Sequence, residues 1–177
     1  MAGLDILLRY SNTPGAVAQP PLEWPAGAPI QPVSGQFTLI AFVHSQCPCS
    51  RASLGELERI IACCKEQVQT TVFFSIPTGT PPGFGQTDLW ETATRIPTVR
   101  VLADSNATEA RRFGARTSGQ VLLYDRRRRL VFSGGITAFR GHSGDNDGRD
   151  AIVSVVRGET PRHRTTPVFG CALFGDL

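Results

Sequence analysis

Lysine is nearly absent from this 177-residue chain, in which Lys65 is the lone lysine among 18 basic residues. Those 18 residues face 15 acidic ones, and the resulting net charge of +3 is too small to indicate a nucleic-acid partner. The sequence also lacks the run of about 18 apolar residues that a membrane-spanning helix requires, and its first residues lack the pattern of a signal peptide. It contains neither a glycine-rich phosphate loop nor a dinucleotide fingerprint. We therefore expect no organic cofactor.

The composition is typical of a globular protein. Hydrophobic residues make up 41% of the chain, charged residues make up 19%, and the mean hydropathy is −0.08. These values exclude wholesale disorder, a collagen-like repeat and a coiled coil. A chain of this length is expected to form one compact core.

The chain divides into three predicted parts. Residues 1–36 are rich in proline and small residues, and they predict an extended, semi-rigid tether. Residues 37–157 carry the hydrophobic patterns of a folded domain, and residues 158–177 form a polar tail that contains Cys171.

Apolar periodicity and turn residues predict the secondary structure of the central part. We expect strands at 37–43, 70–76, 98–102, 120–124 and 130–133, and helices after Cys49 and at 88–94, 106–113 and 149–156. Asp147 or Gly148 is expected to cap the last helix. This order predicts an α/β protein with a mixed sheet of about five strands, helices on both faces, and a terminal β-hairpin and helix.

The five cysteines are an odd number and too few for a disulfide scaffold. Cys47 and Cys49 form a C-x-C pair, and Cys63 and Cys64 are adjacent, a clustering that points to redox or metal chemistry. Cys47 lies where a buried strand ends and a helix begins. The helix dipole and the free backbone N–H groups there stabilise a thiolate, which predicts a reactive cysteine over the alternative of a buried structural one.

The strand before Cys47 and the residues after it resemble the thioredoxin-like superfamily. In this resemblance Cys47 matches the nucleophilic cysteine and Ser50 matches the second one, whereas the second cysteine here is Cys49. The stretch from residue 113 to 125 resembles the segment that carries a cis-proline beside the active site, and Gly119 takes the place of that proline. The resemblance implies a thioredoxin-like fold in which Pro48, Ser118 and Gly119 contact the substrate.

A closer resemblance is to the bacterial redoxins labelled RedB. The similar segments are residues 47–53, 111–115, 117–119, 132–137, 140–142 and 167–171. This resemblance implies a thiol–disulfide oxidoreductase of the periplasm or cell envelope that acts on thiols or disulfides of a protein partner. It also implies a membrane anchor before the proline-rich tether, and therefore membrane proximity; a cytoplasmic protein is the alternative.

The sequence leaves open which cysteine resolves a mixed disulfide and which group tunes the thiolate. Cys49 is expected to resolve a mixed disulfide on Cys47, and such a small ring is expected to be strained and oxidising. Cys171 is the second candidate, because a tail can reach an active site. His44 is a candidate for tuning the thiolate or transferring a proton, because imidazole titrates near neutral pH.

Two other functions compete with the oxidoreductase. Cys47 and Cys49 with His44 or His142 provide soft ligands for copper or zinc. A peroxiredoxin-like peroxidase is the other alternative, although those enzymes carry a threonine where this chain has His44. We expect the site to hold no resident metal.

Overall fold

The computed structural model describes residues 9–175. The strands and helices follow one another in the predicted order, and the last two strands are joined directly, without a helix between them. The strands are β1 (Phe37–His44), β2 (Val68–Ile76), β3 (Val99–Ser105), β4 (Gln120–Tyr124) and β5 (Leu130–Gly134). The helices are α2 (Ser50–Cys64), α3 (Asp88–Arg95), α4 (Thr108–Arg112) and α5 (Asp147–Val156), and a 3-10 turn, η1 (Lys65–Gln67), leads into β2.

The five strands form one mixed sheet in the order β3-β2-β1-β4-β5. Strand β1 pairs in parallel with β2, and β2 pairs in parallel with β3, whereas β4 runs antiparallel to both β1 and β5. Seven of the eight residues of β1 are buried, which agrees with its continuous apolar sequence and its central position. The predicted mixed sheet and terminal hairpin are therefore confirmed.

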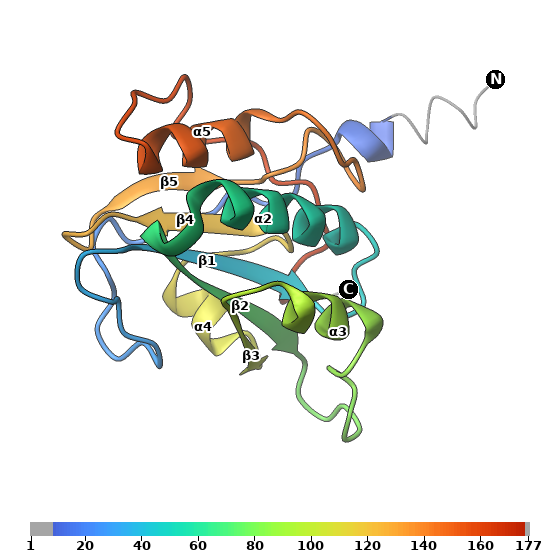
Figure 1. Ribbon diagram of the computed structural model, residues 1–177. Helices are drawn as coiled ribbons and strands as arrows, with labels where there is room; N and C mark the ends of the chain where they lie inside the picture. The colour runs from blue at the N-terminus through green and yellow to red at the C-terminus, as the bar shows by residue number, and fades with distance from the viewer. Residues whose placement is uncertain (1–8, 176–177) are drawn as a thin grey trace.

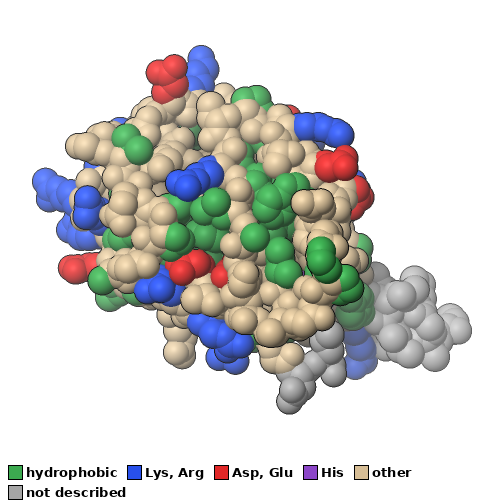
Figure 2. Space-filling model, turned by 90° about the horizontal axis from the view of Figure 1, so that it is seen from below, with side chains coloured by type: hydrophobic (Ala, Val, Ile, Leu, Met, Phe, Trp, Pro, Cys, Tyr) green, Lys and Arg blue, Asp and Glu red, His purple; other side chains and the backbone are tan. Residues whose placement is uncertain are grey.

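Helices cover both faces of this sheet (Figure 1). The hydrophobic cluster on one face joins β1 to α2, α3 and α5 through residues such as Leu54, Leu89 and Ile152. The cluster on the other face contains Phe113, which follows α4, and residues of the N-terminal segment and the tail. Figure 2 views the molecule from below, and hydrophobic side chains on this surface are interspersed with basic and acidic ones.

The described part of the proline-rich segment packs against the domain. Trp24 makes edge contacts with the rings of Phe113 and Tyr124 at centroid distances of 5.2 Å. Its backbone N–H donates to the carbonyl of Arg128 at 2.9 Å, and Ile30 is 1% exposed within the core. The segment has little regular structure, as its prolines predict, but these apolar side chains fix it against the face of the sheet that carries Phe113 and Tyr124.

Asn146 caps α5, since its side chain accepts a hydrogen bond from the backbone N–H of Arg149 at 2.7 Å. The predicted caps, Asp147 and Gly148, are instead the first two residues of the helix. Asparagine ranks with aspartate as a capping residue, and two candidates in series are not separable by pattern alone.

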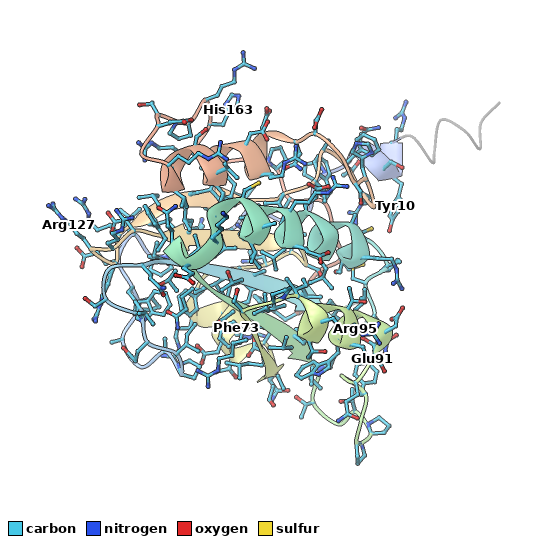
Figure 3. All side chains as sticks on the ribbon, viewed as in Figure 1. Tyr10, Phe73, Glu91, Arg95, Arg127 and His163 are labelled. Atoms are coloured by element: carbon cyan, nitrogen blue, oxygen red, sulfur yellow. The ribbon has the colours of Figure 1, made fainter. Side chains whose placement is uncertain are left out.

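The β4–β5 hairpin carries consecutive arginines at its turn, and Arg127 points away from the body of the protein (Figure 3). Asp125 organises this turn by accepting hydrogen bonds from the backbone N–H groups of Arg127 and Arg129. Among the described residues, the structure contains no helix with the length and hydrophobicity needed to span a membrane.

Candidate active site around Cys47

The candidate site lies in the turn that joins β1 to α2. The backbone N–H of Cys47 donates to the carbonyl of His44 at 3.0 Å, and the N–H of Ser50 donates to the carbonyl of Cys47 at 3.1 Å. These bonds hold Cys47 just before the N-terminus of α2, for which Cys49 is the capping residue. The position is the one that the strand-to-helix pattern predicts, and the helix dipole there favours an anion.

Cys47 is fully buried, with an exposed fraction of 0%. Burial is the largest influence on the pKa of its thiol and raises it, but hydrogen bonds outweigh that effect. The donors are the backbone N–H and the thiol of Cys171, the hydroxyl of Ser50 and the backbone N–H of Cys49. The pKa of Cys47 therefore lies below its ordinary value, so its thiolate forms more readily than that of an ordinary cysteine.

Ser50 and Ser118 link the thiolate to β1 through a chain of hydrogen bonds. The backbone N–H of His44 donates to the Ser118 hydroxyl oxygen at 2.8 Å, and the two serine hydroxyls lie 2.8 Å apart. Because Ser50 donates to Cys47, the Ser118 hydroxyl is the donor to Ser50. The sequence resemblance predicts Ser118 as a substrate contact, and here its hydroxyl belongs to the hydrogen-bond chain of Cys47. Sequence reasoning missed Ser50 as a donor, although its position at the start of α2 was a usable signal.

Cys171 reaches the site because the tail pairs with the segment before β4. The backbone N–H of Ser118 donates to the carbonyl of Cys171 at 2.8 Å, and that of Leu173 donates to the carbonyl of Arg116 at 2.9 Å. Thr117 and Ala172 form the antiparallel bridge between these bonds. The tail residue that the sequence offered as a second candidate thus lies against Cys47.

The thiols of Cys171 and Cys49 both have raised pKa values. Burial is the main cause for each. The hydrogen bond to Cys47 and the negative charges of Cys47 and Cys49 add to it for Cys171, whose pKa rises to about 12. The Cys49 thiol also bonds to Cys47, and the guanidinium of Arg140 partly offsets its shift. The site therefore combines one low-pKa sulfur with two neighbouring thiols that stay protonated at neutral pH.

Arg140 is a site residue that sequence reasoning missed. It forms a hydrogen bond with the side chain of Cys49 and donates to the backbone carbonyl of Tyr10 at 3.0 Å. Its guanidinium carbon also lies 4.6 Å from the centre of the Tyr10 ring. Arg140 belongs to a loop about 90 residues beyond Cys49, and no sequence spacing indicates such a contact.

The sequence predicts that His44 tunes the Cys47 thiolate, but its contacts lie elsewhere. Its Nδ1 accepts a hydrogen bond from the backbone N–H of Gln46 at 3.2 Å, and burial lowers the pKa of the imidazole. The ring lines a cavity of about 240 Å³ together with Ser75 and Leu173. The groups that lower the pKa of Cys47 do not include this imidazole.

Gly119 and Pro48 complete the surroundings of the cysteine. Gly119 has a φ of +91°, and a Cβ atom there would lie 3.0 Å from the hydroxyl oxygen of Ser53. Its N–H donates to the carbonyl of Phe42 at 2.8 Å, which holds the start of β4 beside β1. Pro48 is exposed in the turn before α2. Glycine therefore suits this close, left-handed position, where a residue with a side chain would be strained.

The remaining cysteines lie at the other end of α2. Cys64 is 1% exposed in the core, and burial raises its pKa to about 11, whereas Cys63 is exposed. Within residues 9–175, no cluster of three or more His, Cys, Asp or Glu side chains is arranged to hold a metal ion.

Replacing Ser50 by alanine tests the hydrogen-bond chain. The variant loses one donor to the thiolate, so we expect the pKa of Cys47 to rise by about one unit, the change that one hydrogen bond to a charged group produces. The pH dependence of iodoacetamide alkylation at Cys47 measures this shift. Ser53→Ala on the same helix is the control and should leave the midpoint unchanged; an unchanged midpoint in Ser50→Ala would contradict the donor role.

No family model and no curated protein sequence matches the chain. Solved structures do resemble it. An uncharacterized conserved protein from Geobacillus kaustophilus is 19% identical with a TM-score of 0.65, and the match covers 93% of each chain. The hypothetical protein SMc02350 from Sinorhizobium meliloti is 23% identical with a TM-score of 0.63, covering 79% of this chain and 80% of that one.

The exposed lipoprotein thioredoxin Etrx1 from Streptococcus pneumoniae is 19% identical with a TM-score of 0.51, over 71% of this chain and 86% of that one. Together with the strand order, this likeness confirms the predicted thioredoxin-like fold. The protein is thus a thioredoxin-like α/β domain with a cysteine site at the N-terminus of α2.

Proposed function

We propose that this protein is a thiol–disulfide oxidoreductase that acts on protein partners, with Cys47 as its nucleophile. The observation that carries the proposal is the contact of a low-pKa Cys47 sulfur with the protonated thiols of Cys49 and Cys171. Thiol–disulfide exchange needs an attacking thiolate and a second thiol within reach. It needs no organic cofactor, because the electrons pass between sulfur atoms.

In the reducing direction, the Cys47 thiolate attacks one sulfur of a substrate disulfide. The substrate S–S bond breaks, its electron pair leaves with the departing sulfur as a thiolate, and a mixed disulfide forms on Cys47. A second cysteine of the site then loses its proton to solvent and attacks the Cys47 sulfur. This step releases the second substrate thiolate, so two electrons have moved to the substrate and one internal disulfide remains. The oxidising direction is the reverse.

Cys171 is the better-placed resolving cysteine. Its N–H and its thiol both bond to Cys47, and a tail residue can approach without distorting α2. The Cys49 thiol also bonds to Cys47, but it lies only two positions away in the turn before α2, and a Cys-Pro-Cys ring requires that turn to open. The release of a proton from Cys171 is the step that its raised pKa makes slow at neutral pH.

The envelope location and the RedB assignment belong to the same proposal. Their support is the resemblance of residues 47–53 and 167–171 to those redoxins and the likeness to Etrx1, which is an exposed lipoprotein. If an anchor holds the protein near a membrane, the exposed arginines of the β4–β5 hairpin offer positive charge to anionic head groups. Disulfides persist in that compartment, so a redox role there is physically consistent.

Disulfide mapping tests the proposal. The protein is oxidised, its free thiols are alkylated, and the peptides are identified without reduction. We expect a link from Cys47 to Cys171 that dithiothreitol removes. A link from Cys47 to Cys49 would keep the oxidoreductase and assign the other resolving cysteine, whereas alkylation of Cys47, Cys49 and Cys171 in every molecule would overturn it.

A further inference from the structure

The tail shields the thiolate that the proposed reaction requires. Cys47 is 0% exposed, whereas Cys171 is only half-buried over it. Pro48 and Gln46 on the flanks of Cys47 are exposed, so the turn itself lies at the surface. A protein disulfide cannot reach the Cys47 sulfur while the tail stays in this position.

The tail is held as a short added strand. Residues 171–173 run antiparallel to residues 116–118 and exchange backbone hydrogen bonds with them on both sides of the Thr117–Ala172 bridge. These bonds use main-chain groups, which any extended segment offers, and strand addition at such an edge is a general mode of peptide binding. A cysteine at the position of Cys171 is thereby presented to Cys47.

We propose that residues 170–173 of the tail are an internal stand-in for the protein substrate. They occupy the docking edge, residues 116–118, beside the substrate contacts that the thioredoxin-like resemblance implies at Ser118 and Gly119, and an extended, cysteine-containing substrate segment must displace them. The inference rests on the proposed function for the chemistry that follows docking. The substrate segment displaces the tail, takes over its backbone bonds and presents its own sulfur to Cys47.

The edge also restricts the residue that precedes the docked cysteine. A Cβ atom on Gly170 would lie 2.0 Å from the backbone carbonyl oxygen of Ser118, and a backbone atom cannot move aside as a flexible side chain does. A substrate segment in the same register therefore needs glycine immediately before its cysteine. Leu173, which is 4% exposed beside Ser75, indicates an apolar residue two positions after the cysteine.

Displacement of the tail also determines when Cys171 takes part in the exchange. While the mixed disulfide joins Cys47 to the substrate, the tail is displaced and Cys171 is free to ionise in water. The Cys171 thiolate then attacks the Cys47 sulfur, forms the Cys47–Cys171 bond and expels the substrate sulfur with its electron pair, and the tail regains its backbone bonds as the substrate segment leaves. The internal disulfide then closes the edge until it is reduced.

Gly170→Ala tests the stand-in role on reduced, full-length protein. The added methyl group collides with the Ser118 carbonyl and displaces the tail, while the three site cysteines remain. We expect alkylation of Cys47 by iodoacetamide to accelerate at least about tenfold, the change that 1.4 kcal/mol of lost tail contact produces. Gly55→Ala is the matched control, because no atom lies within 4 Å of its Cβ position, and it should leave the rate unchanged.

A peptide then tests the docking edge directly. The peptide copies residues 167–174 with Cys171→Ser, and at saturation it should return the Gly170→Ala alkylation rate toward the original value. The same peptide with Gly170→Ala added should not protect. If Gly170→Ala does not fold, Leu173→Ala replaces it, since it weakens the tail anchor at the buried end.

An unchanged alkylation rate in a folded tail variant, or equal protection by both peptides, would overturn the docking proposal. These measurements use reduced protein and need no disulfide to form. Failure of the docking edge is therefore distinguishable from failure of the oxidoreductase function, which disulfide mapping reports.

Discussion

Cys47→Ser is expected to reduce thiol–disulfide exchange to the background rate. A serine hydroxyl is not ionised near neutral pH and cannot form a disulfide, so the attacking group is removed while the size of the side chain is nearly preserved. The measurement is the reduction of a disulfide-containing protein substrate under single-turnover conditions. Cys63→Ser is the matched control, because Cys63 is exposed at the far end of α2.

The same assay separates the two resolving candidates. With Cys171→Ser, we expect the mixed disulfide on Cys47 to accumulate and turnover to fall nearly as far as in Cys47→Ser. With Cys49→Ser, we expect turnover to continue, since a disulfide between Cys49 and Cys47 would require the turn that joins them to open. Continued turnover in Cys171→Ser together with loss in Cys49→Ser would contradict this assignment.

The pH dependence of the reaction follows from the same pKa shifts. Because the pKa of Cys47 is lowered, its thiolate persists below the ordinary thiol pKa, and attack slows only as the pH falls through the lowered value. The pKa of Cys171 is shifted the other way, to about 12 in the covered site, so resolution continues to speed up at pH values where attack is already fast. Attack and resolution should therefore have separate pH profiles in pre-steady-state measurements.

The elements that the sequence predicted well are those set by local pattern. The apolar run of β1 and the three- and four-residue spacing on α2 specify both elements, and together they locate Cys47 at their junction. The place of the thiolate at the start of α2 follows from that junction, whereas the largest hydrogen-bond contributions that lower the pKa of Cys47 come from Cys171 in the tail. The order of strands and helices then limited the topology to few choices.

The contacts that the sequence did not predict join segments far apart in the chain. Cys171 meets Cys47 through backbone bonds at residues 116–118, and backbone pairing leaves no side-chain pattern in a short tail. Arg140 reaches Cys49 across a loop without periodicity. The docking of Trp24 depends on the rings of Phe113 and Tyr124, which come together only when the sheet and the residue after α4 have packed.

A buried ion pair shows the same limit inside a correctly predicted helix. Glu56 lies on α2 among apolar positions and is 0% exposed. Its carboxylate binds the guanidinium of Arg149 at 2.8 Å and accepts from the backbone N–H of Gly144 at 2.9 Å. The amide of Asn146, the cap of α5, donates to it at 3.3 Å. Glu56 therefore fastens the loop before α5 to the helix that starts at the cysteine site.

Glu56→Ala is expected to be strongly destabilising. Removing one partner of a buried pair costs about 3–5 kcal/mol in the free energy of unfolding when the other charge is left alone. Arg149 keeps two ion pairs with exposed carboxylates, at 3.0 Å to Asp145 and 3.4 Å to Asp150, and these reduce the cost. The side chain of Arg149 is 16% exposed. Because water can still reach part of the guanidinium, we expect a loss toward the lower end of that range. A loss of about 3 kcal/mol corresponds to a fall of roughly 6–12 °C in Tm for a domain of this size.

Chemical denaturation with a matched set of variants distinguishes the buried anchor from a general effect of losing a carboxylate on α2. Glu58→Ala removes an exposed carboxylate from the same helix, and we expect its free energy of unfolding to change by less than about 0.5 kcal/mol. Replacing Glu56 and Arg149 together by leucine and methionine should recover part of the loss, because no unpaired charge remains. Equal stability of Glu56→Ala and Glu58→Ala would show that water reaches Arg149 freely, and the loop before α5 would then not depend on this carboxylate.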